Sequence, residues 1–252
     1  MRENDRIERH GMTHLSVNLN KIGLLRNSRG RNYPNMVEMA ERTLTLGAFG
    51  VTIHPRPDQR HATYQDAYDL KDLLKRFPSA ELNIEGFPDA KFLEVVEEVV
   101  PHQCTLVPDD PNQLTSDHGW NLARDQDALR PVIAKLKQKG IRVVLFMDPV
   151  AENMQLAKDI GADRVELYTE AYANAYGTEG AEAVLAQYQQ AAQAAVMAGL
   201  GVNAGHDLDL NNVEALCAPG HIAEVSIGHA LTAEALDLGW DQVVQAYLAK
   251  LS

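Results

Sequence analysis

The sequence repeats one pattern along its length: a short apolar run, a polar break, and then a segment with helical spacing. The apolar runs are rich in aliphatic and β-branched residues, which is typical of strands buried on both faces of a parallel sheet. Glycines such as Gly47, Gly140, Gly161 and Gly199 end the helical segments. Strands that alternate with helices pair in parallel, so the pattern predicts an α/β fold.

The pattern gives eight predicted strands. They are residues 13–19, 49–54, 81–85, 103–107, 141–147, 164–168, 201–204 and 223–227. Helices are predicted at 34–47, 152–160, 180–198, 211–218 and 240–251, and helical spacing also follows strands two, three and four. Eight such units close into a (β/α)₈ TIM barrel, a fold that takes about 250 residues. No low-complexity linker interrupts the 252 residues, so we expect one domain over 1–252.

A doubly wound open sheet is the alternative architecture. Such sheets usually carry a glycine-rich phosphate loop after the first strand. Here the segment VNLN occupies residues 17–20, and neither a GxGxxG nor a Walker A motif is present. The barrel is therefore the preferred prediction.

Composition excludes several classes of partner. The net charge of −12, from 23 basic and 35 acidic residues, argues against general binding to nucleic acid or to an anionic membrane. No apolar run approaches the ~18 residues of a membrane span, and residues 1–12 lack the apolar core of a signal peptide. Cys104 and Cys217 stand far apart without a metal-binding spacing. We expect a cytoplasmic protein with reduced thiols.

The stretch 49–61 places the most chemically active side chains close together. An apolar strand ends at two prolines, because proline cannot donate to a β-ladder. The eight residues at and after its end contain His54, Arg56, Arg60 and His61. α/β enzymes bind ligands at the carboxyl ends of their strands. A cationic loop in an acidic chain therefore predicts the capture of an anionic ligand.

Other strand ends contribute to the same mouth of the barrel. The side chains expected there are Asn18, Asn20, Asn83, Glu85, Asp148, Glu166, Tyr168, Thr169, Asn203, His206, Ser226 and His229. Strand four is expected to contribute little before Thr115, and residues 21–32 are expected to form a loop over the mouth. Paired histidine and glutamate suit general acid–base chemistry near neutral pH. Gly205 and Gly228 allow close approach of backbone N–H groups to a ligand, which favours a phosphate.

Eight short motifs carry a resemblance to a known family. They are VN and LRNSRG within 17–30, TIHPR at 52–56, RH at 60–61, LNIE at 82–85, CTLVP at 104–108, VNAGH at 202–206 and IGHA at 227–230. In this order, and over nearly the whole chain, they resemble the pyridoxine 5′-phosphate synthase family. The resemblance implies a (β/α)₈ barrel with extra helices, assembled as a homo-octamer.

The resemblance also implies an activity and its residues. The family condenses 1-deoxy-D-xylulose 5-phosphate with 3-amino-2-oxopropyl phosphate, without a metal or an organic cofactor. By motif position, His54 and Glu85 match proton acceptors and His206 matches a proton donor. The expected substrate-binding positions are Asn18, Asn20, Lys21, Arg29, Arg56, His61, Thr115, Asp207, Gly228 and His229.

The chain departs from the family pattern at three places. Asn20 and Lys21 replace Asp-His after strand one, Asp207 replaces a glycine after strand seven, and Tyr168-Thr-Glu170 replaces His-Thr-Gly after strand six. Asp207 and Glu170 put carboxylates where the family leaves bare backbone near a phosphate. Asp207 also suits the N-cap of a following helix, so both interpretations stay open.

Three further functions are compatible with the sequence. The first is a divergent paralogue that acts on a less phosphorylated substrate. The second is a metal-dependent sugar isomerase with Glu85, Glu166, His206 and His54 as ligands, although strand one lacks the His-x-His of many metal-binding barrels. The third is a non-catalytic binding protein, which the intact His54, Glu85 and His206 set disfavours.

Overall fold

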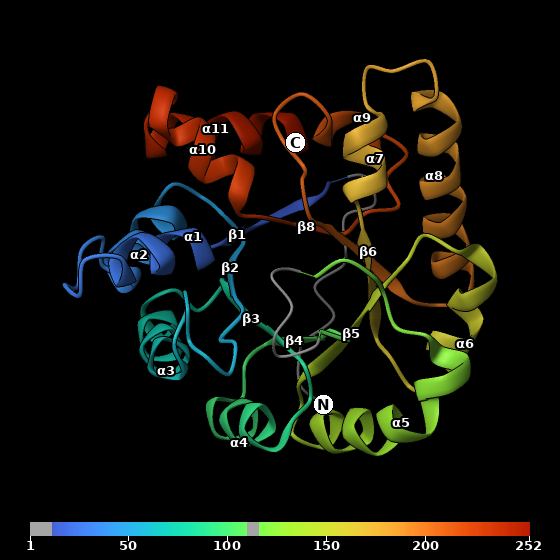
Figure 1. The fold of residues 1–252 in the computed structure, drawn as a ribbon, viewed down its shortest axis with the longest axis horizontal. Helices are drawn as coiled ribbons and strands as arrows, with labels where there is room; N and C mark the ends of the chain where they lie inside the picture. The colour runs from blue at the N-terminus through green and yellow to red at the C-terminus, as the bar shows by residue number, and fades with distance from the viewer. Residues whose placement is uncertain (1–11, 110–115) are drawn as a thin grey trace.

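The computed structural model describes residues 12–109 and 116–252, in which eight parallel strands form a closed barrel in chain order. The strands are β1 (His14–Asn18), β2 (Gly50–Ile53), β3 (Glu81–Gly86), β4 (Gln103–Leu106), β5 (Arg142–Met147), β6 (Arg164–Tyr168), β7 (Gly201–Gly205) and β8 (Glu224–Ile227). The predicted bounds agree within one residue at each end. The helices surround the strands (Figure 1). The predicted barrel is confirmed, and the open-sheet alternative is wrong.

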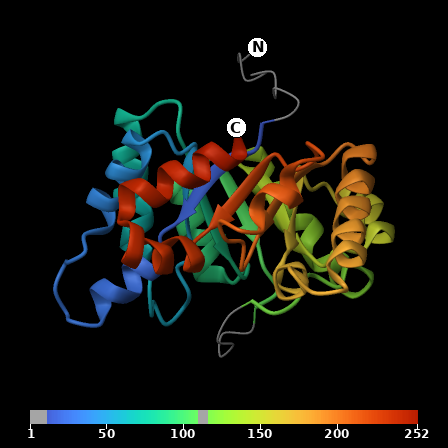
Figure 2. The same ribbon diagram turned by 90° about the horizontal axis from the view of Figure 1, so that it is seen from above.

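Helices connect the strands and cover the outside of the barrel. They are α1 (Asn20–Asn27), α2 (Met36–Thr45), α3 (Tyr64–Leu73), α4 (Ala90–Val99), α5 (Leu122–Gln138), α6 (Met154–Asp159), α7 (Glu170–Ala175), α8 (Ala181–Met197), α9 (Val213–Cys217), α10 (His229–Leu238) and α11 (Trp240–Leu251), with 3₁₀ turns η1 (Leu74–Arg76) and η2 (Ala151–Asn153). Among the described residues, no helix is long and apolar enough to cross a membrane. Helices α1 and α10 lie together at the end where the strands finish, whereas α11 ends near the start of β1 (Figure 2).

The expectation of a loop over residues 21–32 is wrong, because α1 occupies most of that segment. Its polar composition concealed a short buried face formed by Ile22 and Gly23. The helix lies so close to the next connection that a side-chain carbon added at Gly23 would stand 2.7 Å from the backbone of His61. Arg26 and Asn27 also donate to the carbonyl of His61, at 3.2 and 2.8 Å. Helix α1 therefore supports the cationic loop.

Most strands combine an apolar outer face with a polar inner face; β5 is the exception, with Val144 and Phe146 pointing inward. Outward residues such as Val17, Ile84 and Leu145 are completely buried against the helices. Inward residues instead form a hydrogen-bonded belt across the barrel. Its contacts join Ser16 to Thr52 (2.7 Å), Thr52 to Asn83 (3.4 Å), Asn83 to Thr105 (3.2 Å) and Thr105 to Glu166 (3.4 Å). The barrel interior is therefore polar at the level directly below the strand ends.

A second layer of charged residues fills the end of the barrel where the strands begin. Arg142 contacts both carboxylate oxygens of Glu81, at 2.6 and 3.1 Å. Arg164 contacts Glu224 at 3.1 Å, and Gln103 donates to the other oxygen of Glu224 at 3.3 Å. Buried charges of this kind are tolerated because each is paired and hydrogen-bonded. This layer forms the base on which the polar belt rests.

The strand that carries His54 and Arg56 begins at a tight approach between two backbones. In β2, Gly50 lies in register with Glu81 of β3. A side-chain carbon at Gly50 would stand 2.6 Å from the carbonyl oxygen of Glu81, and strand backbone at this position has no room to move away.

We therefore expect Gly50→Ala to lower the free energy of unfolding by roughly 1–3 kcal/mol through overpacking. Urea denaturation followed by circular dichroism measures the change. Gly180→Ala is the matched control, since the nearest atom to an added carbon there is 3.8 Å away. Equal midpoints for the two variants would contradict the close-approach argument.

Candidate active site

His54 and Glu85 lie side by side at the carboxyl ends of β2 and β3. The two strands are in register, and Thr52 and Asn83, two residues earlier in each strand, contact each other inside the barrel. Side chains two residues apart in a strand share a face, so His54 and Glu85 also face the interior. Both are buried, with 6% and 9% of their surface exposed. The structure thus brings two of the three expected catalytic residues together.

Two asparagines at the end of β1 hold this pair. The Asn18 side-chain amide donates to Glu85 Oε2 at 3.4 Å. The Asn20 side-chain oxygen accepts from the backbone N–H of His54 at 2.9 Å, and the backbone N–H of Asn20 donates to Asn18 at 3.0 Å. Gly228 lies against this arrangement, since a side-chain carbon there would stand 2.9 Å from Asn18 Cβ. Asn18, Asn20 and Gly228 therefore belong to the same site.

Arg56 is buried, with 4% exposed, and forms an ion pair with the equally buried carboxylate of Asp109. Ser116 donates to the same Asp109 oxygen at 2.8 Å. The other oxygen, Oδ1, has no hydrogen-bond partner in the part of the chain that the structure describes. The expectation that strand four contributes little before Thr115 is wrong, because Asp109 follows β4 by three residues. Thr115 itself lies outside the described residues.

His61 reaches the site from the loop after β2. Its ring centre is 6.1 Å from that of His54, and its Nδ1 accepts from the backbone N–H of Ala62 at 2.9 Å. In the neutral ring, the proton is then on Nε2. Lys21, in α1, is close enough for its charge to lower the pKa values of both His61 and Asp207. Lys21 and His61 therefore lie in the same positively charged part of the mouth.

Arg29 is the expected residue that stands apart. It is exposed two residues beyond the end of α1. No hydrogen bond or ion pair joins its side chain to another site residue within residues 12–109 and 116–252. The described chain thus does not bring Arg29 to the other candidates.

Burial and neighbouring charges shift the acid–base groups in opposite directions. Burial, followed by repulsion from Glu166 and Asp109, raises the pKa of Glu85 well above its ordinary value, although Arg56 opposes the shift. Burial and the charge of Arg56 lower the pKa of His54 well below its ordinary value. The same causes lower the pKa of His61 to about 4. Near neutral pH the site therefore offers neutral imidazoles beside a carboxyl group with an increased proton affinity.

His206 enters the mouth from the turn after β7, and its neighbours are the residues that depart from the family pattern. The Tyr168 ring meets the His206 ring edge-on at 5.1 Å between centres, and the Tyr168 hydroxyl donates to Glu170. Nδ1 of His206 lies 3.0 Å from Oδ2 of Asp207. Next to this turn, His229 is the exposed first residue of α10, and its charge also lowers the pKa of Asp207.

No hydrogen bond joins any two of His54, Glu85 and His206 among the described residues. The same part of the chain has no group of three or more histidine, cysteine or acidic side chains arranged to hold a metal ion. The ligand set required by the isomerase alternative is thus not assembled in residues 12–109 and 116–252.

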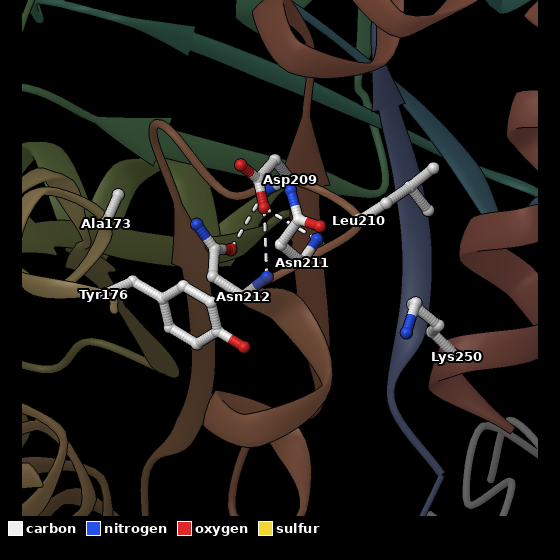
Figure 3. A pocket seen from close by; sticks show the side chains of 7 residues that line it. All are labelled: Ala173, Tyr176, Asp209, Leu210, Asn211, Asn212 and Lys250. Atoms are coloured by element: carbon white, nitrogen blue, oxygen red, sulfur yellow. Dashed lines mark hydrogen bonds between the residues drawn. The ribbon is translucent and has the colours of Figure 1, made fainter. Parts of the chain in front are cut away.

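A cavity of about 620 Å³ lies on the outside of the barrel, separate from the mouth residues. Figure 3 shows its lining, which comes from α7, the connection before α9, and Lys250 of α11. Asp209 there accepts from the backbone N–H groups of Asn211 and Asn212, at 2.8 and 2.9 Å. The cavity is connected to the site only indirectly. Asn212, which lines the cavity, donates to the carbonyl of Asp207 at 3.3 Å.

Two site residues were missed from the sequence. Arg56 and Ser116 both donate to the same oxygen of Asp109, yet Asp109 and Ser116 are seven residues apart in a segment that shows no periodic pattern. The one sequence feature that could have indicated a functional role for Asp109 is its position shortly after a strand, where carboxylates are often functional.

The chain matches a family model and curated relatives over most of its length. The model described as "Pyridoxal phosphate biosynthesis protein PdxJ" matches residues 15–252. A protein from Albidiferax ferrireducens, named pyridoxine 5′-phosphate synthase, is 50% identical over 243 residues, covering 94% of this chain and 96% of that protein. Proteins of the same name from Cytophaga hutchinsonii and Brucella abortus are 48% and 49% identical over 241 residues, covering 95% and 94% of this chain and 99% and 98% of those proteins.

Solved structures with low sequence identity share the fold alone. A protein from Aquifex aeolicus VF5 has a TM-score of 0.64 at 14% identity, covering 97% of this chain and 94% of that chain. A 4-hydroxy-2-oxoglutarate aldolase has a TM-score of 0.59 at 14% identity, covering 94% of each chain. The family match and the curated relatives go further than the fold: the chain belongs to the PdxJ family of pyridoxal phosphate biosynthesis proteins.

Proposed function

We propose that this chain is a pyridoxine 5′-phosphate synthase. It condenses 1-deoxy-D-xylulose 5-phosphate with 3-amino-2-oxopropyl phosphate and releases pyridoxine 5′-phosphate, phosphate and water. The observation that carries the proposal is the buried pair of His54 and Glu85, held by Asn18 and Asn20 at the strand ends. The membership of the family supports it as well.

The reaction is a series of proton transfers on one bound intermediate, which the pair can perform. Schiff-base formation, dehydration and ring closure each need a proton to be removed at one atom and supplied at another. Glu85 has a raised pKa, so its carboxylate takes up a proton readily near neutral pH. His54 has a lowered pKa, so its neutral ring can both donate and accept. After Glu85 and His54, His206 is the third residue that exchanges protons with the intermediate, from the opposite side of the mouth.

Cationic groups and a helix terminus would hold the phosphates. Arg56 is fixed by Asp109, and a planar guanidinium can contact a carboxylate and a phosphate at once. Lys21 and His229 lie on the side of Asp207, where α10 begins without a side-chain cap. Uncapped N–H groups at a helix start favour an anion. Asp207 and Glu170 are engaged with His206 and Tyr168, which limits their repulsion of a phosphate.

We also propose that the protein works as a cytoplasmic homo-octamer. Exposed apolar side chains on α1 and α10, namely Leu24, Leu25 and Leu236, support self-association at this end of the barrel. Analytical ultracentrifugation measures the assembly.

The direct test of the activity is to supply both phosphorylated substrates and to follow pyridoxine 5′-phosphate and released phosphate. Formation of both products in equal amounts is expected. If the protein turned over only a ketose without its phosphate, it would instead be the divergent paralogue.

We expect Glu85→Gln to reduce kcat by at least about 100-fold, because the amide keeps the shape of the side chain but cannot take a proton. Substrate affinity, measured by isothermal titration calorimetry, should change by no more than about threefold. Glu214→Gln, a change in a surface ion pair with Lys250, is the matched control. A Glu85→Gln variant with most of the wild-type turnover would rule out Glu85 as the base.

We expect Arg56→Lys to weaken binding of the phosphorylated ketose by roughly tenfold or more, because an ammonium group cannot contact Asp109 and a phosphate through one planar fork. Higher salt should not reproduce the loss in the wild type, since the pair is buried. Arg42→Lys, on the surface of α2, is the control. Unchanged affinity in calorimetry would show that Arg56 has only a structural role.

A further inference from the structure

The turn after β7 adopts a backbone conformation that side chains disfavour. His206 has φ 87° and Asp207 has φ 57°, so two consecutive non-glycine residues lie in the left-handed region. Such conformations persist only where the surroundings enforce them, and they concentrate at functional sites. The backbone strain of this turn therefore lowers the stability of the chain, and in return the turn orients the side chains of His206 and Asp207.

Hydrogen bonds from both sides hold the turn. The Thr169 hydroxyl contacts the carbonyl of Gly205 at 2.7 Å and also contacts the carbonyl of His206. On the other side, Asn212 donates to the carbonyl of Asp207, and Asn212 is itself held by Asp209, as Figure 3 shows. These bonds fix the backbone on which both side chains stand.

The His206 ring is held between two side chains. Tyr168 meets it edge-on, and the Tyr168 hydroxyl is bound to Glu170. Oδ2 of Asp207 lies 3.0 Å from Nδ1, within the range of a charge-assisted hydrogen bond. An ionised carboxylate at this nitrogen accepts a hydrogen bond from an Nδ1–H group, which leaves Nε2 as the second, unprotonated nitrogen of the neutral ring.

We propose that Asp207 is a positioning residue that keeps neutral His206 in the Nδ1–H tautomer, so that Nε2 exchanges protons with the substrate. The sequence predicts that Asp207 contacts the substrate directly. In this proposal, Asp207 acts on the substrate through His206 instead. The catalytic part of the proposal rests on the proposed function, whereas the tautomer does not.

The charged groups around the turn keep Asp207 ionised. Its hydrogen bond with His206 lowers its pKa, and His229 of α10 and Lys21 of α1 lower it further. On the other side of the ring, burial raises the pKa of the Tyr168 hydroxyl, and Glu170, Asp207 and Asp117 raise it further, so the hydroxyl stays protonated. The ring of His206 thus meets one ionised carboxylate directly, while the second carboxylate is separated from it by Tyr168.

The test is ¹⁵N NMR of the ligand-free protein at about pH 8, where an ordinary histidine is neutral. The chain has nine histidines, and a His206→Gln spectrum identifies the signals of this one. We expect a protonated Nδ1 and an unprotonated Nε2 in the wild type. Asp207→Asn and Asp207→Gly should both give a mixture of tautomers, and the glycine variant removes the carboxylate while accepting the positive φ.

Kinetics of the same variants complete the test. Loss of an orienting partner should lower kcat by about 10- to 100-fold while KM for either substrate changes by no more than about threefold. Asp241→Asn, in an exposed pair with Arg42, is the control. A protonated Nε2 in the wild type, or the same tautomer in wild type and both variants, would overturn the proposal. A correct tautomer without synthase activity would instead reject only the proposed function.

Discussion

The polar inner face of the barrel is the constraint on which the rest of the structure depends. Strand after strand sends aliphatic side chains outward to the helices, and outside β5 most inward positions carry amides, hydroxyls and charges. Barrel interiors are more often filled by branched apolar residues. Here a belt of hydrogen bonds and a layer of paired charges replace them, so that carboxyl groups such as Glu166 and Glu224 lie within the barrel.

The chemistry of the mouth follows from this interior. Glu166 is buried among other carboxylates, which raises its pKa to about 8, and its charge contributes to the raised pKa of Glu85 above it. Arg56 has the opposite effect on Glu85, and its own charge is matched by Asp109. Burial lowers the pKa of His54, and the charge of the same arginine lowers it further. One buried cation thus lowers the pKa values of two neighbouring catalytic candidates, while Asp109 holds it in place.

Local sequence patterns predicted the strands and their carboxyl ends well. Side chains two residues apart in a strand share a face, and the register of β2 and β3 then places His54 beside Glu85. Other features depend on contacts between distant segments. Helix α1 shows no clear apolar stripe, because its buried face is only wide enough to rest on the loop before Ala62. The Arg56–Asp109 pair spans 53 positions, and neither residue carries a signal of its partner. The positive φ of His206 is enforced by hydrogen bonds from residues distant in sequence, such as the Thr169 hydroxyl.

Burial in the polar interior gives Glu85 an increased proton affinity, which suits the role of base that we propose for it. The most direct measurement is a carboxyl ¹³C NMR titration of the ligand-free protein, with Glu85 assigned by comparison with Glu85→Gln. Burial and the neighbouring carboxylates predict a midpoint well above the value of about 4.3 that is ordinary for glutamate. A Glu85 midpoint at that ordinary value would contradict the account, because the interior would then exert no control over the base.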